Sequence, residues 1–464
     1  MTTSASLVEA PGAQPAAPGL DQCGADWAGR RVVVVGLARS GVAACRLLQQ
    51  AGSRVRVTEL RRNDATQQFA EELSQAGVEA VELGDHRREL LEGCEIMVVS
   101  PGVPETTLPI QWAHEHGVPI VSEVELAFRF CPAPIIAVSG TNGKSTAVTL
   151  IHNLLTACGR SSVVCGNIGI PFSSMIPSLQ PEMTVVLEVS SFQLLGCERF
   201  RPSIGLLLNL GTNHLDRHPD RAHYVAAKAR LFQRQTADDY AVLNHTDPEV
   251  VEIGRRVAAQ RVWFGDSGLE NSPRFRLHPS TCRALPANLQ AVLQVGRILG
   301  IPDPLTHQII REFKGLEHRI EYVATIRGVT YLNDAKSTTP ESCLYALGRC
   351  AGPVVAIVGG KDKGLDFQSL QATLTQLRIR GVVLIGETRP TLRALLNGSS
   401  HVRECDRLDE AVRVAAELAR PGDTVLFSPA CASFDMFKNF EERGTRFKAC
   451  VRDLAAAQPA GPIA

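Results

Sequence analysis

The sequence predicts an α/β protein with three domains in series, each built on a parallel, doubly wound sheet. Short apolar runs that fit buried strands alternate with helical runs along most of the chain. Several of these runs end in glycine-rich or polar segments, and open parallel sheets bind ligands at the carboxyl ends of their strands. A chain of 464 residues also exceeds the size at which single cores stop growing.

The composition is that of an ordinary globular protein and argues against several classes of partner. Hydrophobic residues make up 44% and charged residues 21% of the chain, and positive and negative side chains balance. Such a chain lacks the basic field that attracts nucleic acid or acidic lipid. The 13 cysteines are scattered without a CxxC pair, so neither a zinc site nor a disulfide framework is predicted. Scattered cysteines of this kind predict reduced thiols and a cytoplasmic protein. No apolar run is long enough to span a membrane, and the start lacks a signal-peptide pattern.

Residues 1–28 are predicted to form a disordered tail, and residues 29–122 the first domain. The tail consists mainly of Ala, Pro, Gly, Ser and Gln and has few large apolar groups. From Arg31 onward, apolar runs alternate with helical patterns. The predicted strands of the first domain are 32–35, 54–59, 96–100 and 118–122.

The glycine-bounded loop Gly36–Gly41 suggests a nucleotide site after the first strand. The second glycine of a dinucleotide fingerprint is Ala38 here, and Glu59 ends the next strand, where an acid could bind a ribose. A mononucleotide or a uridine diphosphate group fits this loop as well as NAD. The structural alternative is a tight turn that binds no ligand.

The second predicted domain, 123–316, contains the most informative segment of the chain. A buried strand at 135–138 is followed by a small glycine-punctuated loop, by Lys144 and Ser145, and by a helical run at 147–158. This order predicts a phosphate cradle in which Lys144 reaches the outer phosphates and the Ser145 hydroxyl ligates Mg²⁺. Val138 stands where the usual phosphate-loop pattern has its first glycine. The predicted strands of this domain are 135–138, 161–165, 184–189, 204–210 and 241–244.

Four charged or titratable residues of this domain have different expected roles. Glu188 and His214 end neighbouring predicted strands, and a carboxylate and an imidazole near a phosphate-loop serine suit a magnesium site. His218 is expected at the surface. Lys228 lies between alanines in a helical stretch, which by itself indicates a solvated lysine.

The third predicted domain, 317–464, ends several strands in polar loops. Lys336 and Lys363 offer cations for carboxylates or phosphates, and Ser433 at an expected helix start offers donors for an anion. Cys431 is interpreted as a small structural residue. Ordinary loops without a ligand are the alternative. The predicted strands are 321–332, 353–358, 381–385 and 423–427, and the polar loops are 333–338, 359–364 and 428–435.

Together, these motifs resemble the Mur ligase family from about Gly29 to the end of the chain. Any one of them is unspecific, but their series and order are highly specific, and the altered phosphate loop is the family's own form. The ending at 428–444 resembles that of the members that add D-glutamate. The matching segments are 140–145, 166–169, 188–193, 209–217, 315–319, 333–338, 360–364 and 428–444.

The resemblance implies a fold, an activity and partners. The fold would be a Rossmann-like N-terminal domain, a central P-loop ATPase-type α/β domain and a Rossmann-like C-terminal domain, which close during catalysis. The activity would be ATP-dependent amide bond formation that adds D-glutamate to UDP-N-acetylmuramoyl-L-alanine through an acyl phosphate, in peptidoglycan precursor synthesis. A monomer that neither binds nucleic acid nor inserts into membranes is expected.

The resemblance also assigns roles to residues. The catalytic group would be Lys144, Glu188, His214 and Lys228, and two Mg²⁺ ions would be held by Ser145, Glu188, His214 and a carbamate on Lys228. The ATP contacts would be Gly140, Thr141, Asn142, Gly143, Lys144, Ser145, Thr146, Asn288, Arg319 and Asp334. The uridine nucleotide would contact Leu37, Ala38, Arg39, Arg61, Ser100, Gly102 and Asn167. The D-glutamate pocket would contain Lys336, Thr338, Lys363, Ser433, Phe434 and Phe440.

The sequence departs from the family pattern at two places. Ala284-Leu285 stands where a His-Asn pair often precedes the asparagine at 288. In the uridine site, Glu59 stands in place of the shorter Asp, and Leu60 replaces a polar neighbour.

Three other functions remain as alternatives. A folate polyglutamate ligase shares the phosphate loop, but the ending at 428–433 and the N-terminal unit argue against it. A non-catalytic nucleotide-binding protein would not need Glu188, His214 and Lys228 together. A dinucleotide oxidoreductase built on the first domain is disfavoured by Ala38.

Overall fold

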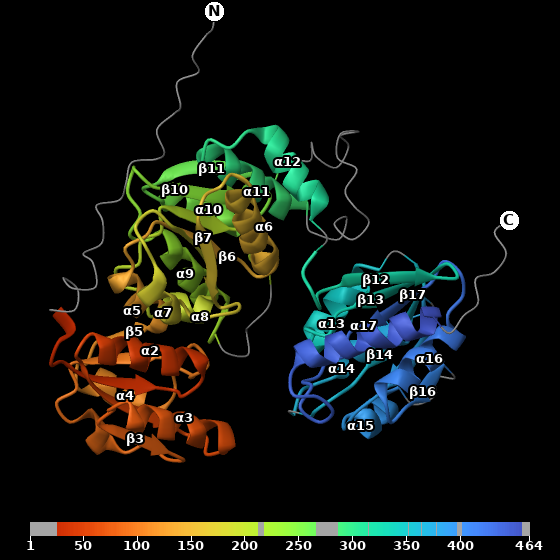
Figure 1. Cartoon of the computed structure of the whole chain (residues 1–464), viewed down its shortest axis with the longest axis horizontal. Helices are drawn as coiled ribbons and strands as arrows, with labels where there is room; N and C mark the ends of the chain where they lie inside the picture. Colours follow the sequence, from red (N-terminus) through yellow and green to blue (C-terminus); the bar gives the residue numbers. More distant parts are fainter. Residues whose placement is uncertain are drawn as a thin grey trace, which may run out of the picture. The chain divides into compact units, whose positions relative to one another are not determined.

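The computed structural model describes residues 26–211, 218–265, 286–313, 315–350, 352–362, 364–376, 378–396 and 401–456. The chain divides into two compact units, the first at 1–276 and 285–311 and the second at 277–284 and 312–464. Figure 1 shows the sheets of both units with helices packed against them. Within the described ranges, no helix combines the length and hydropathy that a membrane span requires.

The first sheet of unit one is fully parallel, as predicted, with strand order β3-β2-β1-β4-β5. Alternate residues of β1 enter two separate apolar clusters, which makes this sheet doubly wound. The edge strand β3 was not predicted from the sequence, and its residues are only partly buried. The elements are β1 (Arg31–Val35), α2 (Arg39–Gln50), β2 (Arg54–Glu59), α3 (Asp64–Gln75), β3 (Ala80–Leu83), η1 (Arg88–Leu91), β4 (Ile96–Val99), α4 (Leu108–Glu115) and β5 (Ile120–Ser122).

The predicted tail is wrong at its end, because Trp27 belongs to the folded domain. Its side chain is buried, and its ring lies 5.7 Å from the ring of Phe130. Burying so large an apolar ring outweighs the polar composition that precedes it. Residues 1–25 lie outside the described residues.

The second sheet of unit one is also parallel, with strand order β11-β10-β9-β6-β8-β7. Strand β6 lies at the centre between β9 and β8, so the segments that follow these three strands meet at one edge. The strands are β6 (Ile135–Ser139), β7 (Ser162–Gly166), β8 (Thr184–Glu188), β9 (Ile204–Leu207), β10 (Tyr240–Asn244) and β11 (Gln260–Phe264). The helices are α6 (Lys144–Ala157), α7 (Phe172–Met175), η2 (Ile176–Ser178), α8 (Ser191–Leu195), α9 (Arg221–Ala229), η3 (Arg230–Phe232), α10 (Pro248–Arg256), α11 (Pro286–Ile298) and α12 (Asp303–Glu312).

Helix α5 (Glu123–Phe130) joins the two sheets of unit one and is fixed to the second. The fully buried carboxylate of Glu125 accepts hydrogen bonds from the backbone N–H groups of Glu198, Arg199 and Phe200, at 2.9–3.0 Å. Arg129, one turn along α5, pairs with the same carboxylate. One continuous cluster of buried side chains runs through both sheet regions. The first domain and the helix that follows it therefore pack on the second sheet.

The sheet of unit two has strand order β12-β13-β17-β14-β15-β16 and is parallel except for β12. Buried clusters cover both of its faces, one with side chains of α13, α14 and α15 and the other with side chains of α16 and α17. The strands are β12 (Glu321–Ile326), β13 (Val329–Asn333), β14 (Val354–Val358), β15 (Ile379–Leu384), β16 (Val402–Glu404) and β17 (Thr424–Phe427). The helices are α13 (Pro340–Gly348), α14 (Gln368–Leu374), α15 (Arg389–Leu395), α16 (Leu408–Leu418) and α17 (Phe440–Ala456).

The single strand predicted at 321–332 is wrong, because the structure has an antiparallel hairpin there. Arg327 and Gly328 form its turn with φ of 51° and 76°. Positive φ at both central residues is typical of the type I′ turn, whose twist matches that of paired strands. Arginine rarely occupies such a position, so the sequence carries a weak turn signal.

Candidate active site

The loop between β6 and α6 has the geometry of an anion site. Gly140 and Gly143 have φ of 147° and 86°, and α6 begins at Lys144 with no acidic residue in its first turn. The Lys144 ammonium donates to the carbonyl oxygens of Gly140 at 2.8 Å and Thr141 at 2.9 Å. Unbonded N–H groups at a helix start together with a lysine attract phosphate. The predicted phosphate cradle thus has the expected strand, loop and helix.

Asn288, on α11, lies directly against this loop. A Cβ atom placed on Gly143 would lie 1.7 Å from the Asn288 amide nitrogen, so position 143 requires glycine on steric as well as conformational grounds. Asn288 is 2% exposed, and its Oδ1 atom has no hydrogen-bond partner among the described residues. A buried carbonyl oxygen without a donor usually marks a ligand or water position.

Ser145, Glu188 and Asn167 form one hydrogen-bonded group at the edge where β6, β7 and β8 end. The Ser145 hydroxyl donates to one carboxylate oxygen of Glu188 at 2.7 Å, and the Asn167 amide donates to the other at 2.9 Å. Ser145 and Glu188 are both buried. Two oxygen ligands this close fit Mg²⁺, which prefers carboxylate, hydroxyl and phosphate oxygens. His214, another predicted ligand, lies outside the described residues.

Lys228 is buried, contrary to what its position between alanines indicates. Its side chain is 2% exposed, and its ammonium donates to Gly140 O at 3.0 Å and Ser139 Oγ at 3.2 Å. Burial, and then the nearby Lys144 cation, hold the pKa of Lys228 well below its usual range, while Glu188 acts in the opposite direction. A cation cannot ligate Mg²⁺, whereas a carbamate on the same nitrogen would supply oxygen atoms. Ser145 and Glu188 fit such a site as they are, whereas Lys228 would fit it only in that modified form.

Tyr224, one turn before Lys228 on α9, is a site residue that sequence reasoning missed. Its hydroxyl lies 2.6 Å from Thr141 Oγ1, which also accepts the Gly211 N–H at 2.7 Å. The Lys228 ammonium lies 5.1 Å from the centre of the Tyr224 ring. The spacing of four residues, which places both side chains on one helix face, was the available signal.

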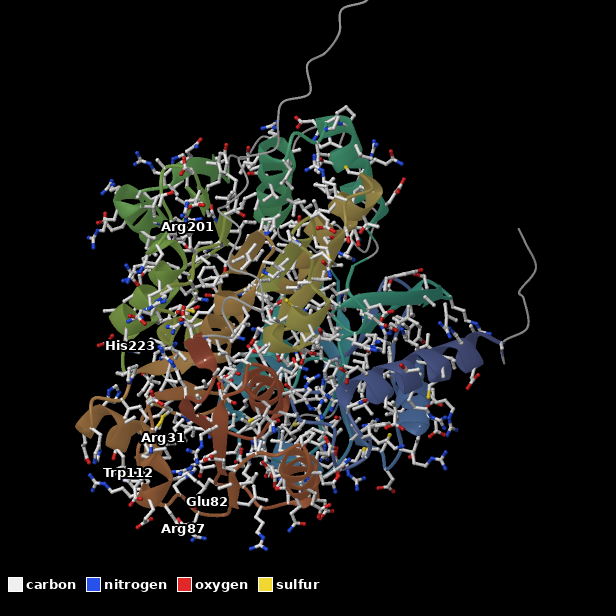
Figure 2. The ribbon with its side chains drawn as sticks, turned by 60° about the vertical axis from the view of Figure 1, so that its left-hand side comes forward. Arg31, Glu82, Arg87, Trp112, Arg201 and His223 are labelled. Carbon is white, nitrogen blue, oxygen red and sulfur yellow. The ribbon has the colours of Figure 1, made fainter. Side chains whose placement is uncertain are left out.

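The expectation that His218 lies at the surface is wrong. Its side chain is 2% exposed and stacks on the Phe192 ring, with ring centres 4.8 Å apart. Its two nitrogens lie 2.9 Å from Ser191 Oγ and from the Nδ1 atom of His223, which is labelled in Figure 2. Aromatic packing and two polar partners explain the burial of a residue that the sequence presents as isolated.

A cavity of about 530 Å³ in unit one contains most of the predicted uridine-nucleotide contacts. This volume is within the range of small-molecule sites. The second sheet domain contributes Gly166, Asn167 and Gln193 to its wall. Leu37, another predicted contact, is buried and does not line the cavity. The predicted residues that line the cavity are Ala38, Arg39, Arg61, Ser100, Gly102 and Asn167.

Two acids of this cavity have different environments. The Glu59 carboxylate accepts the backbone N–H of Leu37 at 2.8 Å and pairs with Arg61 at 2.9 Å. Burial raises its pKa, but the hydrogen bonds from Arg61 and Leu37 outweigh this and lower it. Glu123 is 1% exposed, and burial raises its pKa, with only the Ser173 N–H and hydroxyl opposing the shift. Glu59 is thus held by Arg61 and the loop rather than free for a ribose.

In unit two, Asp334 lies at the centre of a buried hydrogen-bond group. Its carboxylate accepts from Ser337 Oγ at 2.6 Å, Ser428 Oγ at 2.7 Å and Ile320 N at 3.1 Å. His318 and Ile320, which flank Arg319, have φ of 61° and 46°. Positive φ is costly for a β-branched residue, so the group holds this turn in a strained conformation. Arg319 itself is exposed.

Asp334→Asn is expected to change how stability depends on pH. Burial raises the pKa of Asp334 to about 6, so the folded state holds this proton more tightly than the unfolded chain. Wild-type unfolding free energy should therefore fall as pH rises from about 4 to about 6, by up to about 3 kcal/mol from this group. The asparagine side chain cannot ionise, so the unfolding free energy of the variant should not show this fall. Relative to that of the wild type, it should therefore rise across the same pH range. Urea unfolding at a series of pH values measures the difference, and parallel curves would contradict it.

The predicted D-glutamate residues are partly brought together. The Lys336 ammonium lies 5.8 Å from the centre of the Phe440 ring. Ser433 is buried, whereas Phe434 is exposed and Thr338 is partly exposed. Lys363 lies outside the described residues. Cys431 is a buried free thiol whose pKa burial raises to about 11, as expected of a structural residue.

The site and the fold together define a class of protein. Unit one has a phosphate loop beside a buried acid and a buried lysine, and a separate α/β unit with lysine-bearing loops follows it. This combination is that of a nucleoside triphosphate-dependent enzyme. Family models match along the chain: the Mur ligase MurD-like N-terminal domain at 30–122, the Mur ligase middle domain at 138–279, and the glutamate ligase domain at 318–431. The chain belongs to the Mur ligase family and is an ATP-dependent acid–amino-acid ligase.

The chain is similar to curated relatives over almost its whole length. A UDP-N-acetylmuramoylalanine--D-glutamate ligase of Geobacter sp. (strain M21) is 40% identical over 442 residues, covering 91% of this chain and 97% of that protein. The ligase of the same name from Pelotomaculum thermopropionicum is 37% identical over 451 residues, covering 92% and 99%.

Solved structures support the fold. MurF from Acinetobacter baumannii superposes with a TM-score of 0.57 at 15% identity, covering 96% of this chain and 100% of that chain. The UDP-N-acetylmuramate-alanine ligase MurC from Thermotoga maritima superposes with a TM-score of 0.55 at 17% identity, covering 92% and 100%.

Proposed function

We propose that the protein joins D-glutamate to UDP-N-acetylmuramoyl-L-alanine, with ATP as the energy source, in the cytoplasmic synthesis of peptidoglycan precursors. The observation that carries this proposal is the near full-length similarity to ligases of that name, at 40% identity for the Geobacter protein. The phosphate loop, the cavity of unit one and the lysine-bearing loops of unit two each supply a site for one of the three substrates. We expect a monomer, which size-exclusion chromatography with light scattering would test.

The reaction requires that anionic groups be brought together. The terminal carboxylate of the nucleotide substrate takes the γ-phosphoryl group of ATP, and ADP leaves. The amine of D-glutamate then attacks the acyl phosphate, a tetrahedral intermediate forms, and phosphate leaves as the amide forms. Lys144 and the start of α6 bind the phosphates, and Asn288, with its free buried carbonyl oxygen, fits an amino group of the adenine side.

Mg²⁺, when bound, would neutralise phosphate charge between Ser145 and Glu188. We propose that Lys228 completes this site as a carbamate, formed when its amine attacks carbon dioxide and loses a proton. Three observations support the modification: the nitrogen is buried, it lies beside the phosphate loop, and Glu188 is near enough to affect its charge. His214 is proposed as a further ligand from the family resemblance.

The cavity of unit one is proposed to hold the uridine nucleotide part of the acceptor. Ala38, Arg39 and Ser100 line it at the carboxyl ends of β1 and β4, where parallel sheets bind nucleotides. Asn167 lines the same cavity and also donates to Glu188, so one residue would connect the acceptor with the metal site.

Phosphate release measured with each substrate omitted in turn tests the proposed function. Release should require ATP, D-glutamate and the muramoyl-alanine nucleotide together, because the acyl phosphate forms only on the acceptor and is consumed only by the amine. Matched reactions with L-glutamate and with D-alanine serve as controls. ATP hydrolysis that neither substrate affects would count against the proposal.

Binding measurements separate the alternatives. Calorimetry with a uridine diphosphate-linked acceptor should show saturable binding, which a folate polyglutamate ligase has no reason to show. The same titration with NAD or NADP should show none, and saturable binding of either would reopen the oxidoreductase alternative.

A further inference from the structure

Arg443, on α17, is a buried cation that contacts two of the proposed amino-acid loops. Its side chain is 1% exposed and is the largest among the fully buried side chains of the described residues. The guanidinium donates to Cys431 O at 3.0 Å, Ala432 O at 3.1 Å and Ala335 O at 2.8 Å. All three acceptors are backbone carbonyls, so the contacts are independent of the side chains at those positions.

These carbonyls belong to the segments that follow neighbouring strands of the sheet. Ala335 follows β13, and Cys431 and Ala432 follow β17, which lies between β13 and β14. The segment after β14 also contacts the segment after β17, because Lys361 N donates to Ala432 O at 2.9 Å. A Cβ atom on Gly360 would lie 2.4 Å from Ala432 O and 3.2 Å from an Arg443 nitrogen. One side chain thus holds the loops that carry Lys336 and Ser433.

The charge of Arg443 has no directly paired carboxylate among the described residues. Burial lowers its pKa to about 10, which leaves the group charged at neutral pH, and Asp435 and Asp334 act on it without a hydrogen bond. A desolvated cation that is bonded only to carbonyl oxygens keeps a positive field in its surroundings. That field favours an anionic ligand at the adjoining loops.

We propose that Arg443 is a positioning residue for the acidic amino-acid substrate: it holds the loops after β13 and β17 in their binding geometry and favours a ligand with a second carboxylate. The inference rests on the proposed function and deepens it. Arg443 is not proposed to touch the reacting atoms, since its side chain is 1% exposed and its hydrogen bonds are to backbone oxygens. Its loss should therefore affect the binding of one substrate more than the chemical step.

Kinetics of Arg443→Gln and Arg443→Lys test the proposal. The glutamine variant keeps amide donors but loses the charge and the planar guanidinium group with its several N–H donors. Its KM for D-glutamate should rise at least about tenfold. Its KM values for ATP and for the muramoyl-alanine nucleotide should stay within about twofold. The lysine variant keeps the charge and should recover part of the loss. Equal increases in all three KM values, or a fall in kcat alone, would overturn the proposal.

Arg380→Gln is the matched control. Arg380 pairs with Asp423, which precedes β17 and therefore lies at the opposite end of the same strand. The KM for D-glutamate should not change in this variant. If the wild-type enzyme shows no phosphate release dependent on D-glutamate, the proposed function itself has failed. If it does, and Arg443→Gln has an unchanged KM, only this inference fails.

If neither Arg443 variant folds, hydrogen exchange on the wild-type protein tests the same proposal. Peptides that cover 428–437 should be protected without ligand almost as strongly as β17, and D-glutamate should add little. Rapid exchange in the free enzyme that becomes slow only with D-glutamate would show that the ligand, rather than Arg443, orders these loops.

Discussion

Lys228→Ala is expected to abolish turnover while leaving ATP binding largely intact. We expect a fall of roughly 10³-fold in kcat, because removal of a single preorganised electrostatic group from an active site has effects of this size. The Lys228 ammonium donates to Gly140 O at 3.0 Å, and Lys144 at the start of α6, rather than Lys228, is the lysine proposed to bind the phosphates. Steady-state kinetics and nucleotide titration measure the two effects separately.

The proposed carbamate makes this prediction more specific than the loss of a lysine. Short carboxylates such as formate or acetate should partly restore activity in Lys228→Ala, because they can supply the missing oxygen atoms. Lys228→Arg keeps a cation but cannot form the carbamate, and it should remain inactive. In wild-type protein, isotope-labelled bicarbonate should give a carbamate resonance that Lys228→Ala lacks. Full activity in Lys228→Ala would remove the carbamate from the mechanism.

Lys144→Ala is expected to lose nucleotide binding and activity together. The ammonium is held over the loop by the carbonyls of Gly140 and Thr141, so its charge is already in place for a phosphate group. We expect ATP affinity to fall at least about tenfold and kcat roughly 10²–10³-fold, since the charge acts on both ground and transition states.

Arg255→Ala provides the control for Lys144. Arg255 is an exposed cation of the same domain, paired with Glu252 on α10, and exposed pairs contribute little. Its removal should change neither the ATP affinity nor kcat. An unchanged ATP affinity in Lys144→Ala, measured by calorimetry, would mean that the phosphate cradle has been assigned to the wrong loop.

The sequence predicted most of the sheet strands and the phosphate loop because local patterns determine them. Strand β6 is a short run of buried residues, and the loop that follows it needs glycine at 140 and 143 for positive φ. The edge strands β3, β11 and β16 and the hairpin at Arg327 were missed because edge strands bury little and the turn lacks Asn-Gly or Asp-Gly.

Burial of polar side chains was the part that the sequence could not predict. Lys228 and His218 are both 2% exposed, yet their neighbours in sequence resemble those of surface residues. What buries them is contact with Gly140 and Phe192, which are distant in the chain. The motif resemblance identified Lys228 without this knowledge, but it could not identify Tyr224 or Arg443, whose roles depend on tertiary contacts.

The Glu125 carboxylate has a consequence for how the molecule can be divided. Three amide donors from 198–200 and Arg129 bond to it, and none of the three amides is available to a fragment that ends after α5. Such a fragment would also lose the second-sheet part of the apolar cluster that buries Leu126 and Phe130. The N-terminal domain, when expressed alone, should consequently aggregate, while calorimetric melting of the intact enzyme should show this domain and its neighbour denaturing as one cooperative transition.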